Sequence, residues 1–145
     1  NPYIAHIGVG VAIIGITCSS VFKNEYDFNL NEGDKFQIDD ATINFEQIEI
    51  TNEVNFQSLR ANFLIKKNNK VLANVKAGKN YYPVSKMITS EAGIFHEWNR
   101  DIYFVIGDQK DNNWFVKIYV NPFVSFIWIG VIIMVLSGLI GVTKR

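Results

Sequence analysis

The residue with the clearest chemical potential is His6, which lies near the start of an uncharged run from Tyr3 to Phe22. A helix of this length rises about 1.5 Å per residue and reaches roughly 30 Å, the thickness of a bilayer's hydrocarbon core. An ionisable side chain in such a helix is costly and is by default a candidate functional residue with a partner elsewhere. From physics alone, a ligand or proton-handling role for His6 and a structural role are about equally supported.

A second uncharged run extends from Phe123 to Val142 after Asn121-Pro122, a favoured helix start because Asn caps and Pro suits the first helical position. Trp128 is expected near a membrane interface, and the basic pair Lys144-Arg145 favours a cytoplasmic end. The sequence therefore predicts a transmembrane helix over 3–22, an extracytoplasmic domain over 23–121, a transmembrane helix over 122–142 and a cytoplasmic tail over 143–145.

The charge balance excludes some function classes and locates the polar domain. The chain has 14 basic and 14 acidic residues, so a nucleic-acid partner is not suggested. The acidic residues, and most of the basic ones, lie between the two apolar runs. The single cysteine, Cys18, cannot form an intramolecular disulfide, and Gly15–Cys18 is only a loose match to a lipoprotein cleavage box. Because the chain opens on Asn1 without Met, we expect it to be a piece of something longer.

The middle segment alternates apolar and polar residues, as half-buried strands do. The alternation slips phase at Glu46-Gln47, which predicts a β-bulge, and Lys67–Lys70 is a predicted hairpin turn. From Gly78 to Arg100 the alternation is lost, and we expect an irregular loop there. The predicted fold class is a mixed membrane protein, in which two transmembrane α-helices flank an all-β extracytoplasmic domain that forms a small antiparallel barrel or sandwich.

Motifs for catalysis are absent from the sequence, which has no P-loop, no Cys-x-x-Cys and no nucleophile elbow. Glu91, Glu97, Arg100 and Asp101 are predicted to form surface ion pairs or loop-fixing hydrogen bonds, and His96 to be a solvated loop residue. Six aromatic residues could line a groove for a flat ligand or a peptide, although core and cross-strand pairs are the commoner use. They are Tyr81, Tyr82, Trp98, Tyr103, Trp114 and Tyr119.

Small residues four positions apart on both apolar runs predict close helix packing. On the first run they include Gly8 and Ala12, and on the second run Ser137 and Gly141. Two such faces favour packing into a larger bundle. The alternative is that the two helices pack only on each other, which would leave His6 without a partner.

Six segments in the right order and spacing resemble the C-terminal part of the CcmF family, the membrane haem lyase subunits of bacterial and organellar cytochrome c maturation. The resemblance covers nearly the whole chain. The segments are Ala5–Val9, Thr89–Ile94, Arg100–Tyr103 with Gly107-Asp108, Trp114–Tyr119, Asn121–Phe123, and Ile127–Gly130 with Met134.

The resemblance implies a periplasmic domain between the last two transmembrane helices of a much longer protein, in a bacterial or mitochondrial inner membrane. In that family the histidine of the Ala-His-hydrophobic-Gly motif is an axial ligand of a transmembrane b-type haem, and the matching residue is His6. The second axial ligand would lie on another helix outside this chain. Implied partners are other transmembrane helices, a haem chaperone, apocytochrome c and membrane lipid, and the segment alone is not expected to be catalytic.

The chemistry of the residues agrees with this implied haem site. A neutral imidazole can bind haem iron, and small residues one turn away, such as Gly10, would leave room for the porphyrin plane. From His6 to Phe22 is about 24 Å along a helix, so the haem is expected in the cytoplasmic half of the bilayer.

Departures from the family occur at Gly78–Tyr81, where the family tends to carry an acidic and an arginine residue before the tyrosine pair, and at Ser90 in place of Thr. The family's tryptophan-rich segment is also absent. Two other function classes stay open. One is a membrane-tethered β interaction domain without haem contact, and the other is a lipoprotein-like ligand-binding domain cleaved near Cys18.

Overall fold

The computed structural model describes residues 2–143, so Lys144 and Arg145 of the predicted tail lie outside the described residues. Two apolar helices flank a β-sandwich along the chain, which confirms the predicted fold class. The elements are α1 (Pro2–Val21), β1 (Asn24–Leu30), β2 (Lys35–Ile38), β3 (Ala41–Asn52), β4 (Gln57–Lys67), β5 (Lys70–Tyr82), β6 (Met87–Glu91), β7 (Gly93–His96), β8 (Arg100–Lys110), β9 (Asn113–Pro122) and α2 (Val124–Thr143).

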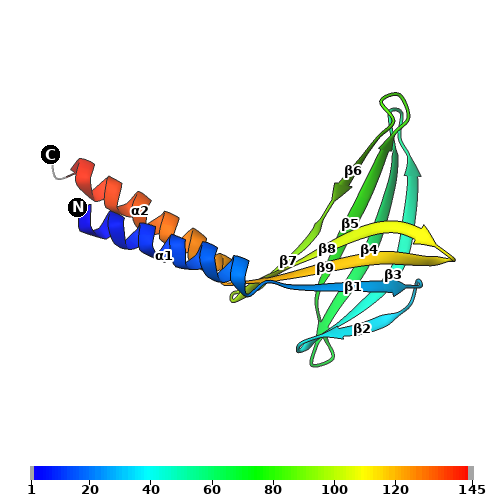
Figure 1. Cartoon of the computed structure of the whole chain (residues 1–145), viewed down its shortest axis with the longest axis horizontal. Coiled ribbons are helices and arrows are strands. Elements are labelled where there is room, and N and C mark those ends of the chain that lie inside the picture. Colours follow the sequence, from blue (N-terminus) through cyan, green and yellow to red (C-terminus); the bar gives the residue numbers. More distant parts are fainter. Residues whose placement is uncertain (1, 144–145) are drawn as a thin grey trace. The chain divides into compact units, whose positions relative to one another are not determined.

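The chain divides into two compact units. One contains the two helices and the turn His96–Asp101, and the other contains residues 25–95 and 102–119. In the second unit the strands form two sheets, with orders β1-β9-β8-β7 and β2-β3-β4-β5-β6 (Figure 1).

Stacked phenyl rings join the two sheets of the sandwich. The ring of Phe63 on β4 lies 5.3 Å from that of Phe45 on β3 and 5.0 Å from that of Phe104 on β8, measured between centroids. All three side chains are fully buried. Since aromatic pairs add to the gain from apolar burial, this stack forms the centre of the core.

The predicted bulge and hairpin turn are confirmed. The register of β3 with β4 runs from Phe45↔Phe63 to Ile48↔Ala61, so two residues on β3 face one on β4. The extra residue places Ile48 on the same face of the sheet as Phe45, opposite the buried Ala61, whereas Ile50 further along the strand is exposed. In the turn after β4, Asn68 and Asn69 have φ of 49° and 61°, the left-handed values that a tight hairpin turn requires.

The prediction of an irregular loop from Gly78 to Arg100 is wrong. The end of β5, β6 and β7 occupy most of this segment. The alternation is lost because β6 pairs with β5 in one sheet while β7 pairs with β8 in the other, so the chain changes sheet near Ala92. A strand that changes sheet also changes the surroundings of its side chains, and no single period of two describes it.

An ion pair spans three neighbouring strands, from Arg60 on β4 across Gly78 on β5 to Glu91 on β6. The register places Arg60 opposite Gly78 and Gly78 opposite Glu91. A Cβ at position 78 would collide with the Arg60 guanidinium, which crosses this strand and pairs with the Glu91 carboxylate. The Asn80 side chain donates to the second carboxylate oxygen at 2.7 Å. Glu91 thus forms an ion pair, as predicted.

The helices α1 and α2 pack closely on each other (Figure 1). A Cβ on Gly130 would lie 2.5 Å from the Gly8 carbonyl oxygen and 2.6 Å from the Ala12 amide nitrogen. Further along, a Cβ on Gly15 would meet the amide nitrogen of Ile127 at 2.7 Å, so the pair is antiparallel. Packing of the two helices on each other therefore accounts for Gly8, Ala12 and Gly15 of α1.

The helix α2 begins at Val124, later than the predicted start at Pro122, which is the last residue of β9. Phe123 lies between them with φ of 61°, and its amide donates to the Asn99 carbonyl at 2.8 Å. This left-handed residue ends the strand, and the helix can start only after it.

We expect Gly130→Val to weaken the helix pair, because its side chain would meet the backbone of α1. Overpacking of this kind costs about 1–3 kcal/mol. The matched control is Gly138→Val on the same helix, where a Cβ meets nothing within 4 Å. Thermal unfolding of the chain in detergent, followed by helical circular dichroism, measures the effect. Equal unfolding temperatures for the two variants would contradict the packing.

We expect Glu91→Gln to reduce the acid sensitivity of the β-sandwich. Hydrogen bonds from Arg60, aided by Asn80 and opposed by partial desolvation, lower the pKa of Glu91 below its usual range. A lowered folded pKa gives stability that is present above the unfolded pKa and is lost as pH falls through the folded pKa.

The variant should therefore lose less stability than the wild type between about pH 5 and pH 3, by less than about 1 kcal/mol because the pair is partly exposed. Denaturant unfolding at a series of pH values measures this difference. The control is Glu46→Gln, which changes an exposed glutamate. If the stability of Glu91→Gln falls with pH as steeply as that of the wild type, the Glu91 ion pair does not contribute to the acid sensitivity.

Candidate functional site

His6 lies on the side of α1 that faces away from α2. Gly8 is buried against α2, and two residues along a helix correspond to a rotation of about 200°. The imidazole is accordingly exposed. The face of α1 that carries the small residues thus packs on α2, and His6 lies on the opposite, exposed face.

The hydrogen bond of His6 determines which ring nitrogen is available. Nδ1 lies 2.6 Å from the carbonyl oxygen of Pro2, four residues earlier. A carbonyl oxygen only accepts, so Nδ1 carries the proton and donates it. In the neutral ring Nε2 then has a free lone pair, and this is the state in which histidine binds a metal.

Gly10 leaves an open space one turn beyond His6 on the same face of α1. A Cβ there would meet no atom within 4 Å. Ile13 and Ile14, which follow, are exposed apolar residues. An imidazole with a free nitrogen, a position without a side chain and an apolar continuation fit the edge of a flat, apolar, metal-containing ligand.

No group of three or more His, Cys, Asp or Glu residues able to hold a metal ion occurs within residues 2–143. Among the described residues His6 is thus a candidate for a single ligand rather than a member of such a group.

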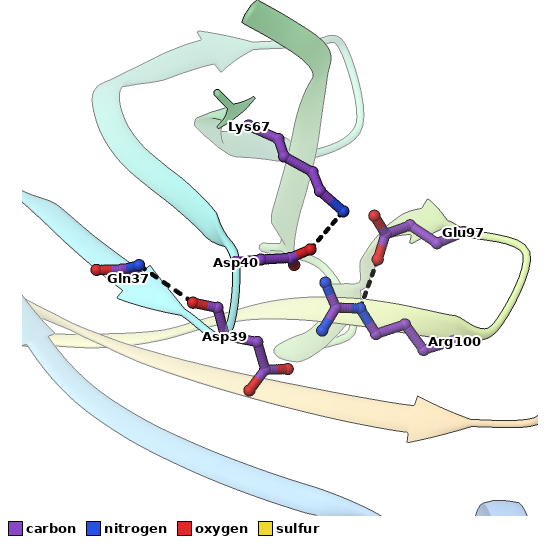
Figure 2. Close-up of polar contacts among 6 residues, drawn as sticks. All are labelled: Gln37, Asp39, Asp40, Lys67, Glu97 and Arg100. Carbon is purple, nitrogen blue, oxygen red and sulfur yellow. Dashed lines mark hydrogen bonds and ion pairs between the residues drawn. The ribbon is translucent and has the colours of Figure 1, made fainter. Parts of the chain in front are cut away.

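The predicted polar cluster forms ion pairs that stabilise a turn. Arg100 pairs with Glu97 (Figure 2), and the Glu97 amide donates to the Arg100 carbonyl at 2.8 Å. His96 Nδ1 lies 3.0 Å from a carboxylate oxygen of the buried Asp101. The exposed imidazole of His96 agrees with the predicted solvated role. Figure 2 also shows a separate pair in the sandwich, Lys67 with Asp40.

The six aromatic candidates do not gather in one groove. Tyr82 packs against Phe56, with 5.3 Å between ring centroids. Tyr81 lines a shallow groove of about 180 Å³ together with apolar side chains that include Ile50 and Ile88. Trp98 belongs to the other unit, where its side chain is exposed.

Lys79 is the cation of this shallow groove, and its role was not predicted from the sequence. Its Nζ lies 2.6 Å from Oδ1 of Asp108, so it links β5 to β8. The hydrogen bond and charge of Lys79 lower the pKa of Asp108. Only the register of the strands reveals this pair, because 29 positions separate the two residues.

Two helices of the described chain, Pro2–Val21 and Val124–Val142, are long and apolar enough to cross a membrane. Their apolar side chains are mostly exposed, which differs from the buried core helix of a soluble protein.

Comparisons with known proteins agree with these features. The family model described as the CcmF C-terminal β-sandwich matches residues 21–122. The cytochrome c-type biogenesis protein CcmF of Haemophilus influenzae is 34% identical over 98% of this chain and 22% of its own length. The corresponding protein ccl1 of Rhodobacter capsulatus is 33% identical over 97% of this chain and 22% of its own length.

A solved structure shares the fold. The chain titled cytochrome c heme lyase CcmF matches with a TM-score of 0.76 and 14% identity, over 94% of this chain and 23% of that one. The present chain thus spans about a fifth of the length of the relatives it matches. Because the family model covers most of it, the chain belongs to the CcmF family and carries that family's C-terminal β-sandwich.

Proposed function

We propose that this chain is the C-terminal segment of a membrane haem lyase subunit of cytochrome c maturation. In this proposal His6 supplies one axial ligand to a b-type haem within the membrane. The observation that carries the proposal is the hydrogen bond from His6 Nδ1 to the Pro2 carbonyl, which leaves Nε2 free on an outward face. Family membership supports the assignment to cytochrome c biogenesis.

The residues of α1 would prepare the site. The Pro2 carbonyl would fix the tautomer and the ring orientation of His6 and leave Nε2 free to bind iron. The open space at Gly10 admits the macrocycle beside the helix. When bound, a haem supplies reversible one-electron transfer, which we propose serves to reduce the haem that is handed over to apocytochrome c.

The β-sandwich would act as an extracytoplasmic scaffold. Most of the charged residues of the chain lie in it, and both apolar helices lead into it. The two basic residues after the second run support a cytoplasmic location for both chain ends. We propose that the sandwich meets a haem chaperone and apocytochrome c, and that other membrane helices supply the second axial ligand.

We expect His6→Ala in the full-length protein to abolish the absorption bands of a low-spin b-type haem, because an axial ligand is lost. The control is His96→Ala, which removes the other histidine of the present chain and should leave the spectrum unchanged. Optical spectra of the reduced, purified proteins measure both. An unchanged spectrum for His6→Ala would instead favour a membrane-tethered interaction domain without haem contact.

We expect Gly10→Leu to reduce haem content several-fold without weakening the helix pair. The new side chain would fill the space that the porphyrin needs, and it points away from the face that packs on α2, since a Cβ at position 10 meets no atom within 4 Å. Haem per protein is measured by pyridine haemochrome, and folding by the thermal unfolding of the helices. Full haem content in this variant would place the porphyrin elsewhere around His6.

A further inference from the structure

The turn Glu97–Arg100 presents an exposed tryptophan on a rigid support. Its ends are closed by the hydrogen bond from the Glu97 amide to the Arg100 carbonyl, at 2.8 Å, and by the ion pair of the two side chains. Both charged side chains are largely buried, at 16% and 10% exposure. The Trp98 side chain, in contrast, is 75% exposed.

The same turn is attached to the beginning of α2. The Ser125 hydroxyl donates to the Trp98 carbonyl at 2.6 Å, and the Phe123 amide donates to the Asn99 carbonyl at 2.8 Å. These bonds hold the backbone of Trp98 and of the residue after it. They use main-chain acceptors of the turn, so they do not depend on the Trp98 side chain.

Other exposed aromatic residues lie at the same end of the helix pair. Phe22 directly follows α1, and Phe123 directly precedes α2, with 59% and 41% exposure. Because the helices are antiparallel, these two residues lie at the same end of the pair. Trp128, 66% exposed, lies four residues after the first residue of α2, or about 6 Å along the helix.

From this arrangement we infer that Trp98 is a membrane-interface anchor, whose indole inserts at the headgroup level of the bilayer. The inference rests on the membrane-spanning helices of the proposed function. Trp and Tyr concentrate at membrane–water interfaces because the ring is apolar and its N–H remains able to donate. Lipid is the occupant that fits, since many apolar side chains of both helices are exposed, Phe22 and Phe123 adjoin these helices in the chain, and the Trp98 carbonyl is bonded to Ser125 at the start of α2.

Anchoring gives the rigid turn a function. Interfacial aromatic residues help to set the tilt and depth of membrane helices. The bonds to Ser125 and Phe123 would transmit the position of the indole to the start of α2. Trp98 would therefore determine how deeply the helix pair sits in the membrane, and with it the depth of His6.

The test uses the full chain in phosphatidylcholine vesicles and the fluorescence of its three tryptophans. The difference between wild type and Trp98→Phe isolates the emission of Trp98. We expect lipid brominated near the headgroup end of the acyl chain to quench this emission roughly two-fold more than lipid brominated near the bilayer centre. Quenching by neither lipid, or more quenching by the deep label, would overturn the anchor.

Two matched variants make the outcome specific. Trp128→Phe isolates an indole of the span itself, which both lipids should quench, and Trp114→Phe isolates one on β9, which neither should quench. If Trp128 is quenched and Trp98 is not, the anchor fails and the membrane arrangement of the proposed function stands. If neither is quenched, the membrane arrangement fails as well, and the anchor with it.

Discussion

The close crossing of α1 and α2 is the constraint on which the candidate site depends. A Cβ at Gly130 would lie 2.5 Å from the Gly8 carbonyl oxygen, so the two backbones can approach only because these positions lack side chains. Between lipid-facing helices such close van der Waals contact is a main source of association. The crossing uses the small-residue face of α1, and His6, about 200° around the helix from Gly8, is thereby directed outward.

The main-chain hydrogen bond of His6 also matters for its chemistry. A carbonyl oxygen has two lone pairs, so the Pro2 oxygen can accept both a helical amide and the imidazole Nδ1–H without loss to the helix. The bond is made within α1, so it needs no partner from another segment. The tautomer suited to metal binding is thus set within α1, by the main-chain carbonyl four residues before the histidine.

Much of the fold could be predicted from the sequence because it depends on local patterns. The phase slip at Glu46-Gln47 identified the bulge, and two asparagines at Lys67–Lys70 identified a turn whose residues need positive φ. The segment after Gly78 could not be predicted, because its order comes from contacts distant in sequence. Arg60 reaches Glu91 across Gly78, and only the strand register brings them together.

The candidate site shows the same division. The sequence shows that residue 6 is a histidine and that small residues lie near it. Which element packs on each face of the helix is known only from the structure. Spacing of Gly8 and Ala12 indicates that some helix packs there, and the structure identifies it as α2. The outward face then carries the only histidine of the described helices, next to an open position at Gly10. The helix pair thus fixes an outward-facing imidazole beside an open backbone position, and this is the feature on which the proposed haem site rests.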